Sequence, residues 1–425
     1  MKNLLIKNGL IVDPANGVEM KGDVLVREGK IAAIGSKVKP VGDEEIIDAN
    51  GLLVSPGFVD LHTHLREPGF EYKETILTGT QSAAAGGFTS ICCMANTNPV
   101  NDQASVTHYI LKQARDLGVV NVYPIGALTK KLEGKELSHM GELKKAGCVA
   151  VSDDGKAVAN NALMRLCFEY AKTFDLLVIT HSVDDCLTNG GVMHEGAIST
   201  KLGLKGIPNQ AEDIMIARDL YLAQLTGARL HVAHVSTKEG VDLIRRAKKK
   251  GCKISCEVTP HHFTLTDAAV KDYDTDAKMM PPLRSQEDRL ALIEGLKDGT
   301  IDAIATDHAP HAPVDKDIEF DIAPCGVVGL ESAFSLSYQL VLDKQITLKK
   351  LVELLSFVPA QVAGLAKGSL SVGADADITV IDLNQSYQID PQKFKCKSKN
   401  SPFTGLQVKG KIVKTIVGGK VVYAS

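Results

Sequence analysis

Apolar runs alternate with amphipathic stretches through the middle of the chain. Eight short apolar runs have the length of buried strands and end in polar residues: 57–64, 89–97, 121–129, 148–154, 176–182, 229–236, 253–262 and 302–311. Most of the intervals between them carry apolar residues at a spacing near 3.6, which predicts helices, for example over 73–85, 162–174, 211–225, 238–250 and 287–297. Near-continuous apolar strands are typical of a parallel sheet covered on both faces. The pattern therefore predicts an α/β fold with a (β/α)₈ TIM-like barrel, and a doubly wound open sheet is the alternative.

The two ends of the chain follow a different pattern, with short β-like runs separated by Gly, Pro, Asn and Asp. Near the C-terminus, runs 411–417 and 420–423 flank Gly418 and Gly419, which indicates a hairpin. Each end has too few strands to fold alone, so we expect the two ends to form one smaller β-sandwich domain together. The predicted domains are a composite β domain over 1–54 plus 367–425 and a barrel over 55–366.

Composition narrows the class of protein. The chain has 425 residues, of which 44% are hydrophobic and 23% charged, as in ordinary globular proteins, and its net charge is −3. Dispersed charge of this kind argues against a nucleic-acid partner. No apolar stretch approaches the roughly 18 residues of a membrane span, and the N-terminus lacks a signal-peptide core. Nine cysteines without a Cys-x-x-Cys pair favour a reducing compartment, so we expect a cytoplasmic protein with no membrane partner.

Metal-type side chains stand at the ends of the apolar runs. They are Asp60, His62, His64, Asp153, Asp154, His181, His234, His261, His262, Asp307 and His308. In a barrel the carboxyl ends of the strands converge on one face, so these residues become neighbours. Because side chains alternate along a strand, His62 and His64 lie on the same face. Two imidazoles that bind one cation need this arrangement. Four histidines with two or three carboxylates suit Zn²⁺ or a similar divalent ion.

A buried histidine is more often a hydrogen-bonded core residue than a ligand, and we assign His108, His139, His194 and His231 to packing. A His-x-His pair alone is a weak signal. Six strand ends that each deliver a metal-type side chain are harder to explain by packing, because each buried unpaired polar group costs about 1 to 3 kcal/mol. The sequence therefore predicts a metal site, while the choice between Asp153 and Asp154 stays open.

Six segments together resemble the amidohydrolase superfamily and, within it, the bacterial type I dihydroorotase family. They span residues 55–69, 94–99, 153–155, 234–239, 257–262 and 305–311. The resemblance implies the reversible zinc-dependent cyclisation of N-carbamoyl-L-aspartate to L-dihydroorotate in de novo pyrimidine biosynthesis, with one or two Zn²⁺ per subunit. It also implies that His62, His64 and Asp307 hold one metal. His181 and His234 would hold the second position, and Asp154 would bridge where related enzymes use a carboxylated lysine.

The same resemblance assigns the substrate side of the site. Zinc-activated water would attack the ring, and Asp307 would carry the proton to the departing amide nitrogen as a general acid and base. Arg66 would clamp the substrate carboxylate. The other expected substrate contacts are His64, Asn96, Met280, His311, Cys325 and Gly326. Met280 and Cys325 depart from the family pattern, which has Asn and Phe at these positions.

These departures keep a second function open, and the resemblance to dihydroorotases, some of which bind aspartate transcarbamoylase, keeps a third open. A hydantoinase- or allantoinase-like cyclic amidase would use the same metal chemistry on another ring. A non-catalytic partner of aspartate transcarbamoylase is the third reading, and the retention of all six metal-type residues makes it the weakest. We expect a homodimer, with aspartate transcarbamoylase as a candidate partner.

Overall fold

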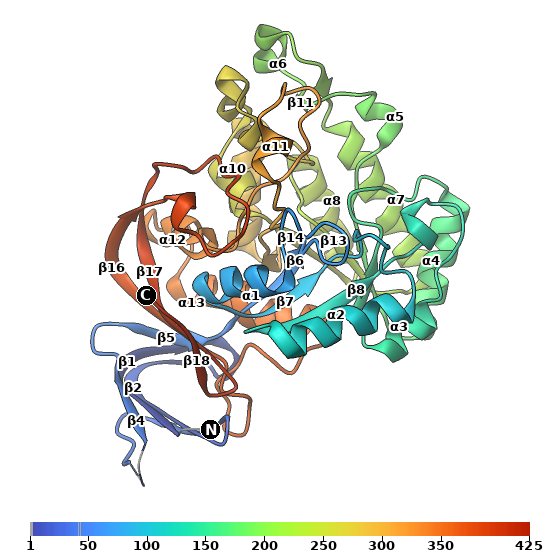
Figure 1. Ribbon diagram of the computed structural model, residues 1–425. Coiled ribbons are helices and arrows are strands. Elements are labelled where there is room, and N and C mark those ends of the chain that lie inside the picture. The colour runs from blue at the N-terminus through green and yellow to red at the C-terminus, as the bar shows by residue number, and fades with distance from the viewer. Residues whose placement is uncertain (1–2, 41, 43) are drawn as a thin grey trace.

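The computed structural model describes residues 3–40, 42 and 44–425. A barrel of parallel strands surrounded by helices lies beside a twisted sheet that both ends of the chain build together (Figure 1). The predicted fold class is therefore confirmed. The predicted boundaries at 54/55 and 366/367 stay a prediction.

Each of the eight apolar runs overlaps one barrel strand, and the strands follow one another in chain order. They are β6 (Phe58–Thr63), β7 (Phe88–Cys93), β8 (Asn121–Gly126), β9 (Ala150–Ser152), β10 (Leu177–Thr180), β13 (Leu230–Val232), β14 (Ile254–Val258) and β15 (Ala303–Ile304). A parallel bridge between Thr63 and His308 joins the end of the eighth strand to the first, so the barrel is nearly closed. Inside it, small and aliphatic side chains such as Leu61, Ile125 and Ala303 form a buried layer beneath the carboxyl-end face.

Helices fill the intervals between the strands. The longer ones are α1 (Ile76–Ala85), α2 (Ala104–Leu117), α4 (Asn161–Thr173), α7 (Gln210–Thr226), α8 (Lys238–Lys249), α10 (Gln286–Asp298) and α12 (Ala333–Leu342). The shorter ones are α3 (Met140–Ala146), α5 (Asp185–Thr188), α6 (Ala197–Leu202), α9 (Pro260–Thr264), α11 (Pro313–Lys316), α13 (Leu348–Val352) and α14 (Val358–Ala363). Side-chain caps begin several of them, since Thr237 accepts a hydrogen bond from the backbone N–H of Gly240 and Ser285 from that of Asp288. Among the described residues, no helix has both the length and the apolar character needed to cross a membrane.

The second sheet joins the two ends of the chain, as the blue and red strands of Figure 1 show. It contains β1 (Leu4–Asp13), β2 (Val18–Arg27), β3 (Lys30–Gly35), β4 (Glu45–Asp48), β5 (Leu53–Pro56), β16 (Ile378–Gln388), β17 (Gln407–Val417) and β18 (Lys420–Ala424). Strand β16 pairs antiparallel with β5, with Ile378 opposite Pro56, so the last strands lie beside the one that leads into the barrel. A separate two-stranded ladder joins β11 (Met193–His194) to β12 (Gly206–Ile207).

Gly86, which ends α1, tests the packing of the barrel. A Cβ at this position would lie 2.1 Å from the carbonyl oxygen of Leu330, although the φ of Gly86 is an ordinary −84°. We expect Gly86→Ala to lower the free energy of unfolding by about 1 to 3 kcal/mol, because backbone must move to admit the methyl group. In the control Gly35→Ala the nearest atom is 3.8 Å away, so the expected change is small. Equal stability of the two variants in denaturant titration would contradict this reading.

Candidate metal centre and substrate cavity

A cavity of about 320 Å³ opens at the carboxyl ends of the barrel strands. Eleven of the twelve residues predicted for the site line it: His64, Arg66, Asn96, Asp154, His181, His234, Met280, Asp307, His311, Cys325 and Gly326. The twelfth, His62, is fully buried and lies within 3.3 Å of Asp154 and 3.4 Å of Asp307. Barrel closure thus brings together side chains that are up to 264 residues apart in the sequence, from His62 to Gly326.

Two overlapping groups of nitrogen and oxygen atoms converge beneath the cavity. In the first, Asp307 Oδ1 lies 3.1 Å from His64 Nε2 and 3.4 Å from His62 Nε2. In the second, Asp154 Oδ1 lies 3.3 Å from His62 Nε2, 3.5 Å from His234 Nε2 and 3.6 Å from His181 Nδ1. The other oxygen of Asp154 lies 3.5 Å from His64 Nε2, so this carboxylate faces both groups.

The orientation of the imidazoles tests whether a metal ion fits. His62 Nδ1 donates a hydrogen bond to Glu257 (2.8 Å), and His64 Nδ1 donates one to Asn96 Oδ1 (2.9 Å). In the neutral form of each ring, these bonds leave Nε2 without a proton and facing the carboxylates, which is how ligand histidines are held. His62 Nε2 and Asp154 Oδ1 are buried without a hydrogen-bond partner among the described residues. This donor set fits a divalent metal ion.

The pKa shifts of Asp154 and His62 are those expected of groups that surround a cation-binding position. Burial alone would raise the pKa of Asp154, but the imidazole of His62, together with His181 and His234, holds it well below its usual range. Burial would lower the pKa of His62, but Asp154 and Asp307 raise it well above the usual value. Two buried carboxylates thus require positive charge between them, which a bound divalent ion provides.

The backbone is strained at three of the predicted site residues. Arg66 has a φ of +62°, His234 of +33° and Asp307 of +46°, all in the left-handed region that residues other than glycine rarely adopt. Such conformations cost on the order of 1 to 3 kcal/mol each and persist where surrounding contacts over-determine them. Their concentration around one cavity is typical of a functional site.

Asp153 and Asp154 face opposite surroundings. Asp153 Oδ1 accepts hydrogen bonds from the backbone N–H groups of Leu128 (2.8 Å) and Thr129 (3.0 Å), and Oδ2 accepts from the Thr129 hydroxyl. Asp153 therefore holds the loop after β8, while Asp154 lies among the imidazoles. Alternation along the strand could not separate these two positions.

Arg66 lines the cavity from the loop after β6. Its Nε donates to the carbonyl of Pro310 (3.1 Å), and Nη2 lies 3.4 Å from His311 Nε2. Nη1 has no hydrogen-bond partner among the described residues, which leaves it available to a ligand. Burial, followed by the charges of Arg66 and Lys73, lowers the pKa of His311 to about 2, so His311 stays neutral. Its Nε2 donates to the carbonyl of Cys325 (2.9 Å), and Nδ1 accepts from Lys73 (3.2 Å).

Two residues of the site had no role in the sequence analysis. Lys73 fixes the ring of His311, as described above. Glu257 on β14 accepts from His62 Nδ1 and also from His231 Nε2 (3.0 Å), and both histidines are buried. A carboxylate inside an otherwise apolar barrel strand was the available signal for Glu257. His231, assigned to packing, is its second partner.

Comparisons with known proteins show the family of the chain. A family model described as "Dihydro-orotase-like" matches residues 51–240, and one described as "Amidohydrolase family" matches residues 242–423. Dihydroorotases of Citrifermentans bemidjiense and Geobacter metallireducens are 53% and 54% identical to the chain over 421 residues, which is 99% of this chain and of each relative. The L-hydantoinase (dihydropyrimidinase) from Arthrobacter aurescens has a similar solved structure, with a TM-score of 0.90 and 28% identity over 100% of this chain and 96% of that one.

A barrel with this histidine and aspartate cluster, matched by these models, defines the protein as an amidohydrolase. Identity above 50% along the full length narrows the class further. The chain belongs to the dihydroorotase family.

Glu257 offers a test of the metal centre. A glutamine has one acceptor oxygen, so Glu257→Gln cannot accept from both His62 and His231, and its NH₂ group would face one of their N–H groups. We expect the variant to bind its metal about 10- to 100-fold more weakly, as is usual when the partner of a ligand histidine is lost. Competition with a chelator of known affinity measures the change.

Glu212→Gln is the matched control, because Glu212 is equally buried and pairs with Arg284 at 3.2 Å outside the cluster. It should lower the melting temperature without changing metal affinity. Similar metal affinity in both variants would show that Glu257 does not support the centre.

Proposed function

We propose that this protein interconverts L-dihydroorotate and N-carbamoyl-L-aspartate in de novo pyrimidine biosynthesis. The observation that carries the proposal is the union, in one cavity, of the histidine and aspartate cluster with the free Nη1 of Arg66. A cyclic amide that bears a carboxylate requires both, one for the ring carbonyl and one for the carboxylate. The relatives named dihydroorotase support the same reaction.

The metal is zinc in this proposal, with one or two ions per subunit, because imidazole nitrogens and carboxylate oxygens are ligands that zinc accepts readily. His62, His64 and Asp307 would hold one ion, and His181 and His234 a second. Asp154, whose two oxygens face both groups, would bridge them. When bound, zinc supplies Lewis-acid chemistry, since it acidifies water and polarises a carbonyl.

Asp307 is the proton carrier. Its side chain is 13% exposed and borders the cavity, while the other residues of its group are more deeply buried. In the ring-opening direction it takes the proton of the attacking water and delivers it to the departing amide nitrogen. Burial would raise the pKa of Asp307, but His62 and His64 lower it, so the carboxylate is ionised and ready to accept. Positioned acid–base groups contribute typically 10²- to 10⁴-fold.

Cavity residues outside the metal cluster orient the substrate in this proposal. Arg66 binds the substrate carboxylate, and neutral His311 and the Asn96 amide add hydrogen bonds. Gly326 has a φ of +143°, and a Cβ there would lie 2.7 Å from the Cβ of Ala309, so glycine lets this part of the cavity wall pack closely against the loop of Ala309 and His311. Met280 and Cys325 would form the less polar part of the wall.

The direct test is an assay of purified protein with dihydroorotate and with carbamoyl aspartate. We expect turnover in both directions with zinc, loss of turnover after chelation, and recovery when zinc is restored. Metal analysis of the active protein reports identity and stoichiometry. Protein that holds metal but turns over neither compound across pH would refute the proposal.

A related cyclic amidase is the second candidate, because Met280 and Cys325 line the cavity and the similar solved structures include a hydantoinase and a dihydropyrimidinase from Brevibacillus agri (26% identity, TM-score 0.87). A panel of hydantoin, allantoin and dihydrouracil separates the two. Faster turnover of an uncharged ring than of dihydroorotate would favour the second candidate.

The assembly and location follow as parts of the same proposal. We propose a homodimer, with aspartate transcarbamoylase as a partner to be tested by co-purification. Nine free cysteines support a reducing, cytoplasmic setting.

Asp307→Asn tests the proton-carrier role. The amide cannot accept the proton, so we expect kcat to fall by about 10²- to 10⁴-fold while the protein stays folded. Circular dichroism and metal content accompany the kinetics, so that loss of metal is told apart from loss of proton transfer. Asp153→Asn is the control, because Asp153 holds the loop after β8: it should reduce stability more than kcat. Near-normal kcat in Asp307→Asn would rule out the role.

A further inference from the structure

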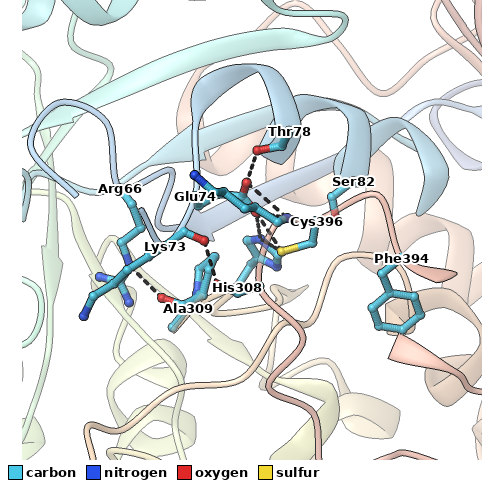
Figure 2. A network of polar contacts seen from close by, with 12 residues as sticks. Arg66, Lys73, Glu74, Thr78, Ser82, His308, Ala309, Phe394 and Cys396 are labelled. Atoms are coloured by element: carbon cyan, nitrogen blue, oxygen red, sulfur yellow. Dashed lines mark hydrogen bonds and ion pairs between the residues drawn. The ribbon is translucent and has the colours of Figure 1, made fainter. Parts of the chain in front are cut away.

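The stretch of residues 394–401, which we call the 394–401 segment, lies between β16 and β17 of the composite sheet but contacts the barrel beside the catalytic site. Cys396 lies against Glu74 and His308, as Figure 2 shows, and Ser398 donates a hydrogen bond to the carbonyl of Lys73 (2.6 Å). Asn400 reaches the loops that follow β15. A segment of the second domain thus borders the site.

Cys396 forms one anchor of this segment. Its Sγ lies 2.7 Å from Glu74 Oε2 and 3.7 Å from His308 Nε2, and all three side chains are buried. The residue types are those of a metal site, but the histidine has the wrong tautomer. His308 Nδ1 accepts the backbone N–H of Gly329 (3.2 Å), so the proton is on Nε2, and a protonated nitrogen cannot ligate. This cluster is a polar anchor.

Asn400 forms the other anchor and uses every group of its amide. Nδ2 donates to the carbonyls of Ala309 (3.1 Å) and Gly326 (3.0 Å), and Oδ1 accepts the backbone N–H of His311 (2.9 Å). Its own carbonyl accepts the N–H of Val328 (2.9 Å). The side chain is buried, so water does not compete for these bonds.

The bonded loops are those that carry the proposed substrate contacts. Residues 309–311 and 325–328 approach the cavity from separate parts of the chain, and Asn400 is bonded to both. Ala309, His311 and Gly326 all line the cavity, whereas Asn400 does not line it. The two loops also bond directly, from Ala309 N–H to the carbonyl of Val327 (2.8 Å) and from His311 Nε2 to that of Cys325 (2.9 Å), and Asn400 adds a third connection from outside the cavity.

We propose that Asn400 is a positioning residue for substrate recognition, which holds His311 and Gly326 at the spacing that the substrate carboxylate requires. This inference rests on the proposed function, because it concerns the affinity for dihydroorotate. It predicts an effect on substrate binding rather than on the chemical step, since Asn400 contacts neither the metal cluster nor Asp307.

Asn400→Asp is the sharpest variant, because it replaces the NH₂ donor with an oxygen that faces two carbonyls. We expect KM for dihydroorotate to rise about tenfold or more, with kcat within about twofold and metal content unchanged, the pattern of lost uniform binding. Asn400→Ala, which removes the bonds without adding charge, should raise KM less. A merely structural role would lower the melting temperature and leave KM unchanged, and that result would overturn the proposal.

Asn121 offers the matched control at the opposite end of the barrel. Asn121 is the first residue of β8. Its amide donates to the carbonyl of Thr89 (2.8 Å) and to the carboxylate of Asp377 (3.1 Å). Asn121→Asp and Asn121→Ala should lower the melting temperature with KM unchanged. A rise in KM equal to that of the Asn400 variants would also overturn the proposal.

Hydrogen exchange measured by mass spectrometry gives a second readout that needs no activity. Peptides that contain residues 309–311 and 326–328 should exchange at least about tenfold faster in Asn400→Ala than in the wild type, while those from β8 should not. Unchanged exchange would overturn the proposal whatever the substrate is. Wild-type protein that fails to turn over dihydroorotate while this exchange difference holds would contradict the proposed function and leave the bridging by Asn400 supported.

Discussion

The closing contact between the first and eighth strands of the barrel is the constraint on which the site depends. Strand β15 spans only two residues, and the closure continues beyond it, where Thr63 pairs with His308 and the N–H of His64 donates to the carbonyl of His308 at 2.8 Å. This hydrogen bond puts His64 beside Asp307, the residue before His308. The backbone that closes the barrel is therefore the backbone that assembles one of the two groups of metal-type atoms.

Closure of the barrel also brings two negatively charged carboxylates close together, and they need positive charge nearby. Asp154 and Asp307 are brought close to the same imidazoles, and their side chains are only 5% and 13% exposed, so little water solvates them and they need compensating charge. Beneath them, Glu257 sets the tautomer of His62 and accepts a hydrogen bond from His231, so that Nδ1 of His62 and Nε2 of His231 both have a partner. Hydrogen bonds to the inner nitrogens direct the outer nitrogens of His62 and His64 toward a cation.

The sheet formed by both chain ends is connected to the site through one of its loops. Strands from both chain ends form one sheet, and the 394–401 segment extends from this sheet to the edge of the cavity. Cys396 contacts the side chain next to Asp307, and Asn400 binds the loops of His311 and Gly326. A segment that carries none of the metal-type residues thereby contacts the loops on two sides of the cavity.

The sequence by itself determined the strand order, the barrel and the identity of the residues around the cavity. The periodicity of apolar residues indicates which side chains are buried. Histidine and aspartate stand out at the ends of apolar strands, because packing alone does not require polar side chains there. Alternation did not separate Asp153 from Asp154, since both faces of a barrel strand are buried and the difference is which neighbour each carboxylate meets. It also did not reveal the roles of Glu257, Lys73 and Asn400. Those roles consist of contacts between residues far apart in the chain, such as Asn400 with His311, and only the tertiary structure decides which distant groups come within hydrogen-bonding distance.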